Sequence, residues 1–386
     1  MFSDRTRWSL APNRLSAALD ARRQSGLPVL DLTASNPTTC GFHYDRDSIL
    51  RALADPAALT YSPDPRGLAS ARHAVADYYA ELGASVGPEG LFLASSTSEA
   101  YSWAFRALCN PGDAVLVPAP SYPLFGFLAD LDDVRLLRYP LLYDHGWQVD
   151  FHALEQALTP AARALIVVHP NNPTGHYTSA AEARRLADLC AARGMALIAD
   201  EVFFDFSLGE VREPRPRTFA AAHSALTFTL SGLSKICGLP QMKLSWLAVS
   251  GPEPHAAEAC ARLEVIADTY LSPSTPVQLA LPALLALRTG FQRQVRERLS
   301  RNLAELDRQL AGQKSCSRLN VEGGWYAVVR VPATRSDEDL VVDLLTTRGV
   351  YIHPGHFYDF PSDGHIVVSL LTPERDFAEG IRALLE

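Results

Sequence analysis

The sequence has 386 residues, and 47% of them are hydrophobic, so the chain can bury a core large enough for two domains. Its formal net charge of −8 argues against a broad basic surface, and therefore against nucleic acid or an anionic membrane as a partner. We expect a globular enzyme with a small-molecule partner.

The N-terminus and the cysteines indicate the compartment. The first residues, MFSDRTRWSLAPNRL, lack the apolar segment of a signal peptide, and no apolar run is long enough to cross a membrane. The cysteines are widely spaced without a CxxC pair, which predicts neither a metal site nor a disulfide framework. They are Cys40, Cys109, Cys190, Cys237, Cys260 and Cys316. Free thiols fit a reducing compartment, so we expect a cytoplasmic protein.

From about residue 90 to residue 249, short apolar runs alternate with amphipathic segments. The expected strands are GLFLAS, DAVLVPAP, RALIVVHP, ALIADEVFF, ALTFTL and SWLAVSG. In the segment SAAEARRLADLCAARG, apolar residues recur at nearly helical spacing, and Gly194 marks the end of the helix. This alternation predicts an α/β fold whose large domain has a mostly parallel, helix-covered sheet.

Polar or turn-forming residues follow most of these strands. They lie in ASSTSEA, PAPSYP, HPNNPTG and ADEVF. Ligands of open α/β sheets bind beyond the carboxyl ends of the strands, so we expect these loops to converge on one site.

A different pattern begins after SPSTPVQ. A long helical segment is expected at residues 279–312, and short strands are expected in GGWYAVVRVP, RGVYIHPGHF and HIVVSLL. We expect a smaller α+β domain there. The expected division is an N-terminal arm at 1–40 that packs with the small domain, a large domain at 41–280 and a small domain at 281–386.

One lysine stands out in TLSGLSKICGLPQMKLSW. Taken alone, Lys235 would be read as a surface lysine. It follows an expected strand, however, near loops that offer Asn172, Asp200 and Tyr122. An amine that loses its hydration has a lowered pKa and can form a Schiff base with an aldehyde.

These segments resemble class I and II aminotransferases of the fold-type I pyridoxal-phosphate superfamily, which are similar to aspartate aminotransferase. SGLSKICGLPQMK resembles the lysine motif of that family, NNPTG its asparagine loop and ADEVF its aspartate strand. The resemblance runs from about Asp31 to the C-terminus. It implies pyridoxal 5′-phosphate as the cofactor.

The resemblance also implies a role for each motif residue. Lys235 would hold the cofactor as an internal aldimine and then move a proton between Cα and C4′. Asp200 would pair with the pyridine nitrogen, and Asn172 would donate to the ring oxygen. Tyr122 would stack on the ring. An ordinary turn around Asn172 and a core position for Tyr122 are the structural alternatives.

The phosphate is expected at a helix N-terminus in SSTSEA, where Thr97 and Ser98 would offer backbone amides. Ser234 would add a hydroxyl, and Ser231 is a weaker candidate. Lys243 stands where the family usually has arginine, and it can neutralise phosphate only as a point charge.

Tyr61, in TYSPDPRG, resembles the tyrosine that crosses the dimer interface to the phosphate of the partner subunit. The resemblance therefore implies a homodimer. The alternative is a turn tyrosine packed on PDPRG.

Three positions depart from the family pattern. Phe203 replaces a tyrosine that hydrogen-bonds the cofactor oxygen. Ser96 replaces a glycine of the phosphate loop, and serine is tolerated there if the backbone angle φ is negative. Val367 replaces the arginine that binds the substrate α-carboxylate, so the substrate stays open. Other basic residues that could serve are Arg66, His353, His356 and Arg375.

The leading hypothesis is an aminotransferase of amino-acid metabolism or biosynthesis that follows a ping-pong route between an amino donor and a 2-oxo acid. The alternative is a pyridoxal-phosphate-dependent lyase, decarboxylase or cyclising enzyme of specialised metabolism, which Phe203 and Val367 motivate. A cofactor-binding regulator would need a DNA-binding module before residue 31, and the pattern shows none. A nucleotide-dependent dehydrogenase would need a GxGxxG motif after the first strand.

Overall fold

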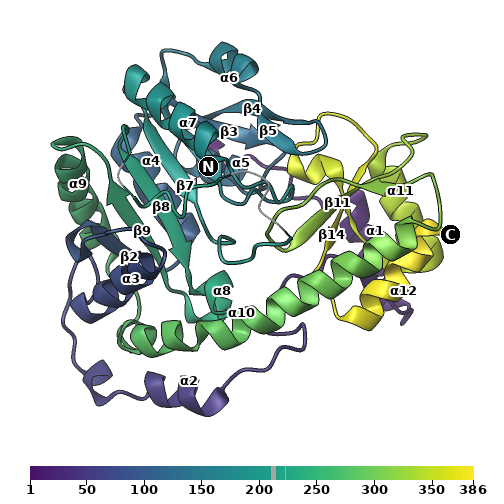
Figure 1. Cartoon of the computed structure of the whole chain (residues 1–386), viewed down its shortest axis with the longest axis horizontal. Helices are drawn as coiled ribbons and strands as arrows, with labels where there is room; N and C mark the ends of the chain where they lie inside the picture. The colour runs from purple at the N-terminus through teal and green to yellow at the C-terminus, as the bar shows by residue number, and fades with distance from the viewer. Residues whose placement is uncertain (210–213, 222) are drawn as a thin grey trace.

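The large sheet has eight strands in the order β2-β9-β8-β7-β6-β3-β4-β5 (Figure 1). The computed structural model describes residues 1–209, 214–221 and 223–386. Neighbouring strands from β8 to β4 are parallel, whereas β2, β9 and β5 pair antiparallel. The prediction of a mostly parallel sheet is confirmed. The strand bounds are β2 (Leu91–Ala94), β3 (Ala114–Ala119), β4 (Arg135–Tyr143), β5 (Trp147–Val149), β6 (Ala162–Val168), β7 (Ala196–Asp200), β8 (Thr227–Gly232) and β9 (Ser245–Ser250).

The central strands are nearly continuous apolar runs because helices cover both faces of the sheet. Every residue of β7 and of β8 is buried. The six strand candidates of this region all lie on strands. Strands β4 and β5 were not predicted, since Arg135, Arg138 and Pro140 interrupt the apolar pattern at the edge of the sheet.

Helices α4 and α9 pack together over β9, and α7 lies against β7. Helix α7 begins at a capping box formed by Ser179 and Glu182, and Gly194 ends it at a φ of 62°. The helix bounds of the large sheet region are α2 (Arg46–Leu53), α3 (Ala69–Glu81), α4 (Thr97–Leu108), α5 (Phe125–Leu131), α6 (Phe151–Ala157), α7 (Ala180–Arg193), α8 (Leu233–Ile236) and α9 (His255–Tyr270).

A second, smaller sheet has the order β10-β11-β14-β13, and a separate pair joins β1 to β12. The long helix α10 contacts α2 and α3 at one end and α12 at the other, so it connects the two halves (Figure 1). The bounds are β1 (Leu30–Asp31), α10 (Thr275–Leu310), β10 (Ser317–Arg318), β11 (Tyr326–Arg330), α11 (Asp337–Asp343), β12 (Val350–Tyr351), β13 (His353–Pro354), β14 (His365–Ser369) and α12 (Glu374–Leu385). The expected boundary between residues 280 and 281 stays a prediction; it would lie inside α10.

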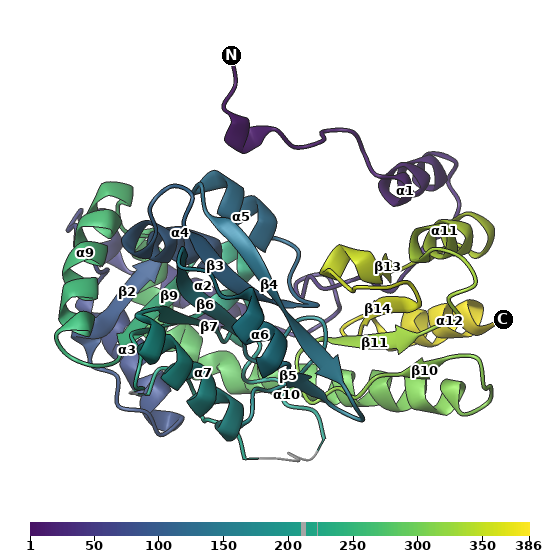
Figure 2. The same ribbon diagram turned by 90° about the horizontal axis from the view of Figure 1, so that it is seen from above.

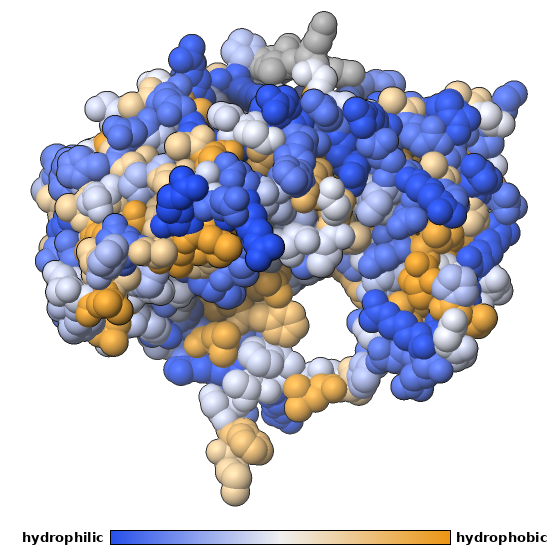
Figure 3. All heavy atoms as spheres, turned by 90° about the horizontal axis from the view of Figure 1, so that it is seen from below, coloured by the Kyte–Doolittle hydropathy of each residue, from blue (hydrophilic) through white to orange (hydrophobic). Residues whose placement is uncertain are grey.

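The N-terminal arm leaves the body of the protein and returns to it (Figure 2). Helix α1 (Arg14–Gln24) packs on α11, whereas the residues before it reach α5. There the indole of Trp8 donates to Asp130 over 2.8 Å and lies edge-on to Phe127, and Arg5 pairs with Asp133. The arm spans an open gap (Figure 3).

Over the described residues, no helix combines the length and the apolar character that crossing a membrane requires.

Candidate active site

A cavity of about 240 Å³ lies beyond the carboxyl ends of β6, β7 and β8, where the sequence predicted a site. The smaller half of the protein contributes Ser35 and Tyr326 to its wall. The lining residues are Ser35, Thr97, Tyr122, Val168, Asn172, Asp200, Val202, Phe203, Gly232, Ser234, Lys235, Ser245 and Tyr326. Six of the residues expected to carry the chemistry are therefore brought together: Lys235, Asp200, Asn172, Tyr122, Thr97 and Ser234.

Lys235 enters the cavity from the short helix α8, which follows β8 without a linker. Its Nζ lies 4.9 Å from the centre of the Trp325 ring and 5.4 Å from that of Phe203. Burial lowers the pKa of this amine to about 8, although the Asp200 carboxylate opposes the shift. About a tenth of the amine is therefore neutral and nucleophilic at pH 7, far more than for an exposed lysine.

Asp200 is the last residue of β7, and its carboxyl group is buried. The hydroxyl of Tyr101 and the backbone N–H of Val202 each donate to it over 3.1 Å. Burial raises its pKa to about 6, against the effect of these two hydrogen bonds and of Lys235. The carboxylate is thus mainly ionised at neutral pH and can hold a proton on a neighbouring nitrogen.

The loop after β6 presents Asn172 to the cavity. Its predecessor Asn171 fixes the loop by donating to the carbonyl of Pro120 and to Thr174, and by accepting from Ser121. In contrast, the side-chain Oδ1 of Asn172 is buried without a partner. An unpaired amide in a cavity is costly unless a ligand completes it.

The anion end of the cavity is formed where α4 begins. Thr97 is the first residue of α4, and Ser96 caps the helix by accepting from the backbone N–H of Glu99. The φ of Ser96 is −161°, which any residue adopts, so a glycine is not required. Ser234 and Ser245 add hydroxyl groups to the same cavity. Amides and hydroxyls at a helix N-terminus suit a phosphate.

Five expected cofactor ligands do not line the cavity, and one of them is Ser96, the N-cap of α4. Ser98 lies one residue further along α4, and the hydroxyl of Ser231 is buried near the carbonyl of Glu201 at 3.5 Å. Lys243 is exposed in a left-handed conformation with a φ of 53°. The side chain of Tyr61 is 76% exposed.

The departures from the family pattern have different surroundings. Phe203 lines the cavity and packs edge-on against Trp325 at 5.2 Å. Val367 is buried in an apolar cluster with Tyr358 and Phe360. None of the alternative basic residues, Arg66, His353, His356 and Arg375, lines the cavity.

Several residues of the site were not found from the sequence. Ser35 and Tyr326 come from distant parts of the chain, and Tyr101 reaches Asp200 from within α4. Ser245 had a local signal, because it begins the strand that pairs with β8 opposite Gly232.

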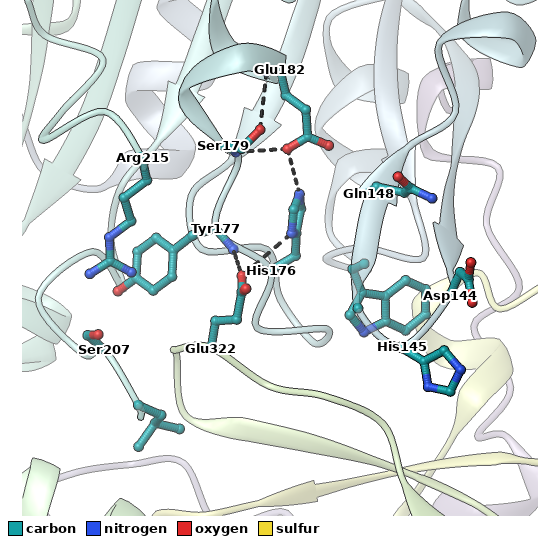
Figure 4. Close-up of a pocket in the computed structure, with 13 residues that line it drawn as sticks. Asp144, His145, Gln148, His176, Tyr177, Ser179, Glu182, Ser207, Arg215 and Glu322 are labelled. Carbon is teal, nitrogen blue, oxygen red and sulfur yellow. Dashed lines mark hydrogen bonds and ion pairs between the residues drawn. The ribbon is translucent and has the colours of Figure 1, made fainter. Parts of the chain in front are cut away.

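A second cavity, of about 340 Å³, is lined by His176 and Tyr177, which follow Asn172 in the chain, and by Glu182 and Glu322 (Figure 4). There the ring of His176 is 3.2 Å from Glu182 and 3.7 Å from Glu322. Burial alone would lower the pKa of His176, but hydrogen bonds to these carboxylates raise it to about 9. The guanidinium of Arg215 covers the ring of Tyr177 at 3.5 Å. The ion pair between His176 and Glu322 joins the loop after β6 to the segment that precedes β11.

The sequence matches the aminotransferase class I and II family over residues 28–383. It is 30% identical over 371 residues to an alanine aminotransferase of Mycobacterium tuberculosis, which covers 93% of this chain and 85% of that protein. An aminotransferase structure from Escherichia coli superposes with a TM-score of 0.86 at 25% identity, covering 99% and 96% of the two chains. An S-alkyl-thiohydroximate lyase of Arabidopsis thaliana is 28% identical over only 62% of this chain and 52% of its own length.

The chain therefore belongs to the class I and II aminotransferases. It is a pyridoxal-phosphate-dependent transaminase of the α/β fold of aspartate aminotransferase, and it transfers an amino group between an amino acid or related amine and a 2-oxo acid. The cavity fits the cofactor: the Lys235 amine suits its aldehyde, the Asp200 carboxyl suits its ring nitrogen, and Asn172 brings an amide to the cavity wall. The start of α4 suits its phosphate.

Proposed function

We propose that transamination takes place in the cavity around Lys235. The observation that supports this proposal most directly is the pair formed by Lys235 and Asp200, a partly neutral amine and a largely ionised carboxyl that influence each other within one cavity. An exposed lysine would keep its proton at neutral pH, whereas burial lowers the pKa of Lys235. An exposed aspartate would be hydrated by water, whereas the buried Asp200 accepts a hydrogen bond from Tyr101 instead.

Each residue has a role in this proposal. Pyridoxal phosphate, when bound, supplies an aldehyde that takes up the amino group and a ring that accepts the electrons of Cα. Lys235 would hold the aldehyde carbon covalently and, once released by the substrate, move the proton between Cα and C4′. Asp200 would keep the pyridine nitrogen protonated, Asn172 would donate to the ring oxygen, and Tyr122 would cover the ring.

The phosphate would be bound by the groups at the start of α4. Thr97 and Ser98 would donate backbone amides, with Ser96, Ser234 and the weaker candidate Ser231 nearby. Lys243 and the Tyr61 of a second copy would complete this end, so the proposal includes a homodimer. The exposure of the Tyr61 side chain in the single chain is consistent with a contact made across an interface.

We propose alanine as an amino donor and a 2-oxo acid as the acceptor, because an aligned relative with high coverage is an alanine aminotransferase. A place in amino-acid biosynthesis and a cytoplasmic location stay predictions from the sequence.

The test is the visible absorption spectrum of the purified protein beside that of Lys235→Ala. We expect a yellow wild-type protein that loses this colour with alanine and regains it with a 2-oxo acid, and a variant that cannot complete the cycle. A wild-type protein that takes up no added cofactor would refute the proposed site.

One observation favours a second candidate, a lyase. Phe203 lines the cavity without offering a hydroxyl to the cofactor, and a carbanion can be directed to other products by small electrostatic changes. Ammonia released from a donor without any 2-oxo acid would support it.

A further inference from the structure

We infer that the carboxylate end of the substrate is held by neutral hydroxyl groups, chiefly those of Ser35 and Tyr326 in the cavity wall, and by no cationic side chain among the residues that the structure describes. The enzyme then discriminates weakly between an amino acid and its uncharged analogues. This inference rests on the proposed function, since it names what the same cavity recognises in the amino donor.

The first support is the charge of the cavity wall. Among the lining residues within the described part of the chain, Lys235 and Asp200 carry the charges, and both are assigned to the cofactor. The arginines expected to substitute for a clamp are bound elsewhere. Arg66 pairs with Glu264 at 2.6 Å, and Arg375 donates to Glu379 at 3.0 Å. A carboxylate in this cavity would therefore meet no guanidinium from the described part of its own subunit.

The second support is the sheet that forms the wall on the small side. In its register, Val367 of β14 lies between Val328 of β11 and His353 of β13, so the three side chains share a face with Tyr326. Val367 is 1% exposed and packs among apolar side chains. The position that would aim a long cation at the cavity therefore holds a short apolar side chain.

His353 does not supply the missing charge. Its Nδ1 lies 3.1 Å from the hydroxyl of Tyr358, and burial lowers its pKa, although Asp31 opposes this. The ring is therefore neutral at neutral pH. Like the Ser35 hydroxyl, it can take part in neutral hydrogen bonds only.

The third support is the way in which the hydroxyls are held. Ser35 and Tyr326 both line the cavity, and interaction with the Ser35 hydroxyl opposes the rise that burial causes in the pKa of Tyr326. Ser369 lies opposite Tyr326 in the sheet, and its hydroxyl donates to the carbonyl of Ala34 over 2.6 Å. The segment carrying Ser35 is thereby fixed beside the tyrosine. The pair is a preorganised donor group that faces the substrate end of the cavity.

A hydroxyl that donates to a carboxylate makes a charge-assisted hydrogen bond but no ion pair, and it can also donate to the oxygen of an uncharged amide or alcohol. We therefore expect the kcat/KM values for alanine, alaninamide and 2-amino-1-propanol to lie within about tenfold of one another. A buried ionic clamp would instead reject the two uncharged donors by on the order of a thousandfold.

The experiment measures kcat/KM and the single-turnover loss of the yellow colour for these three donors with the wild-type enzyme. Values within about tenfold support the inference. Rejection of both uncharged donors by about a thousandfold overturns it while leaving the transaminase proposal intact, and would indicate a cation from a second subunit. Failure of all three donors would overturn the proposed alanine activity, and this inference with it.

Two variants test the named residues. Ser35→Ala and Tyr326→Phe should each raise the KM for alanine by about tenfold and change kcat little, whereas the control Tyr351→Phe, whose hydroxyl lies outside the cavity wall, should change neither. An unchanged KM in both variants would overturn the assignment.

Calorimetric titration with propionate and with propionamide gives a second readout that needs no turnover, and near-equal affinities are expected. A strong preference for propionate would contradict the inference.

Discussion

At the scale of single residues, the buried carboxyl of Asp200 links the proposed chemistry to stability. In the folded protein its pKa is about 6, above its ordinary value, because burial disfavours the charged form. A carboxyl of this kind binds its proton more tightly in the folded than in the unfolded chain. Its stabilising effect is complete below the unfolded pKa and is lost as the pH rises through about 6.

We therefore predict that Asp200→Asn makes the cofactor-free protein more stable at neutral pH, by up to about 3 kcal/mol, since one pKa unit corresponds to about 1.4 kcal/mol. The variant should also lose transaminase activity, because asparagine cannot hold the pyridine nitrogen protonated. The measurement is urea unfolding of the cofactor-free protein at a series of pH values, at one protein concentration.

Asp20→Asn, on the exposed face of α1, is the matched control and should leave the pH dependence unchanged. If Asp200→Asn and the wild type keep the same difference in stability at acidic and at neutral pH, the burial argument for this carboxyl is wrong.

At the scale of elements, the junction of β8 and α8 places Lys235. Gly232 ends β8 and lies opposite Ser245 of β9. A Cβ atom at Gly232 would come within 2.3 Å of the Ser245 hydroxyl oxygen and 2.8 Å of its Cα atom. The two strands approach this closely only because residue 232 has no side chain.

We predict that Gly232→Ala destabilises the protein by about 1–3 kcal/mol and lowers its cofactor affinity, because the strands must separate beside Lys235. The control is Gly126→Ala within α5, where an added Cβ meets no atom within 4 Å. That change should be neutral or stabilising by up to about 1 kcal/mol. Urea unfolding and a cofactor titration measure both effects, and equal behaviour of the two variants would contradict the packing argument.

The elements also show what the sequence could predict. Buried parallel strands are largely apolar, so β6 and β7 were recognisable as apolar runs and β8 by its Phe228 and Leu230, and the polar residues after them converge as expected. Strand β4 was missed because β5 pairs only with its last residues, and the exposed side of the preceding part, which pairs with β3 alone, tolerates charge and proline. Ser35 and Tyr326 were missed for another reason: only the docking of the small sheet brings them to the cavity. The exposed position of Lys243 results from its left-handed backbone conformation, which no local sequence pattern indicated.

At the scale of the whole molecule, exposed apolar side chains in the segment of Tyr61 and at the end of α9 support the proposed homodimer. Leu59 is 93% exposed and Leu271 63% exposed, in addition to Tyr61. Arg66 of the same loop is bound to Glu264 of α9, which brings the loop close to that helix. Apolar groups that remain exposed on one chain commonly mark an interface.

If Tyr61 serves the active site of a second copy, two inactive variants should restore activity when they are mixed. A dimer of one Lys235→Ala chain and one Tyr61→Ala chain has one complete site, which takes its lysine from the second chain and its tyrosine from the first. Random reassociation should then recover about a quarter of the wild-type sites. The measurement is transaminase activity after the mixed chains are dissociated and refolded together, with each variant refolded alone as the control. If Tyr61 acts within its own chain, the site that retains Lys235 lacks the tyrosine and the mixture stays as inactive as its components, so the result identifies the chain that each site depends on.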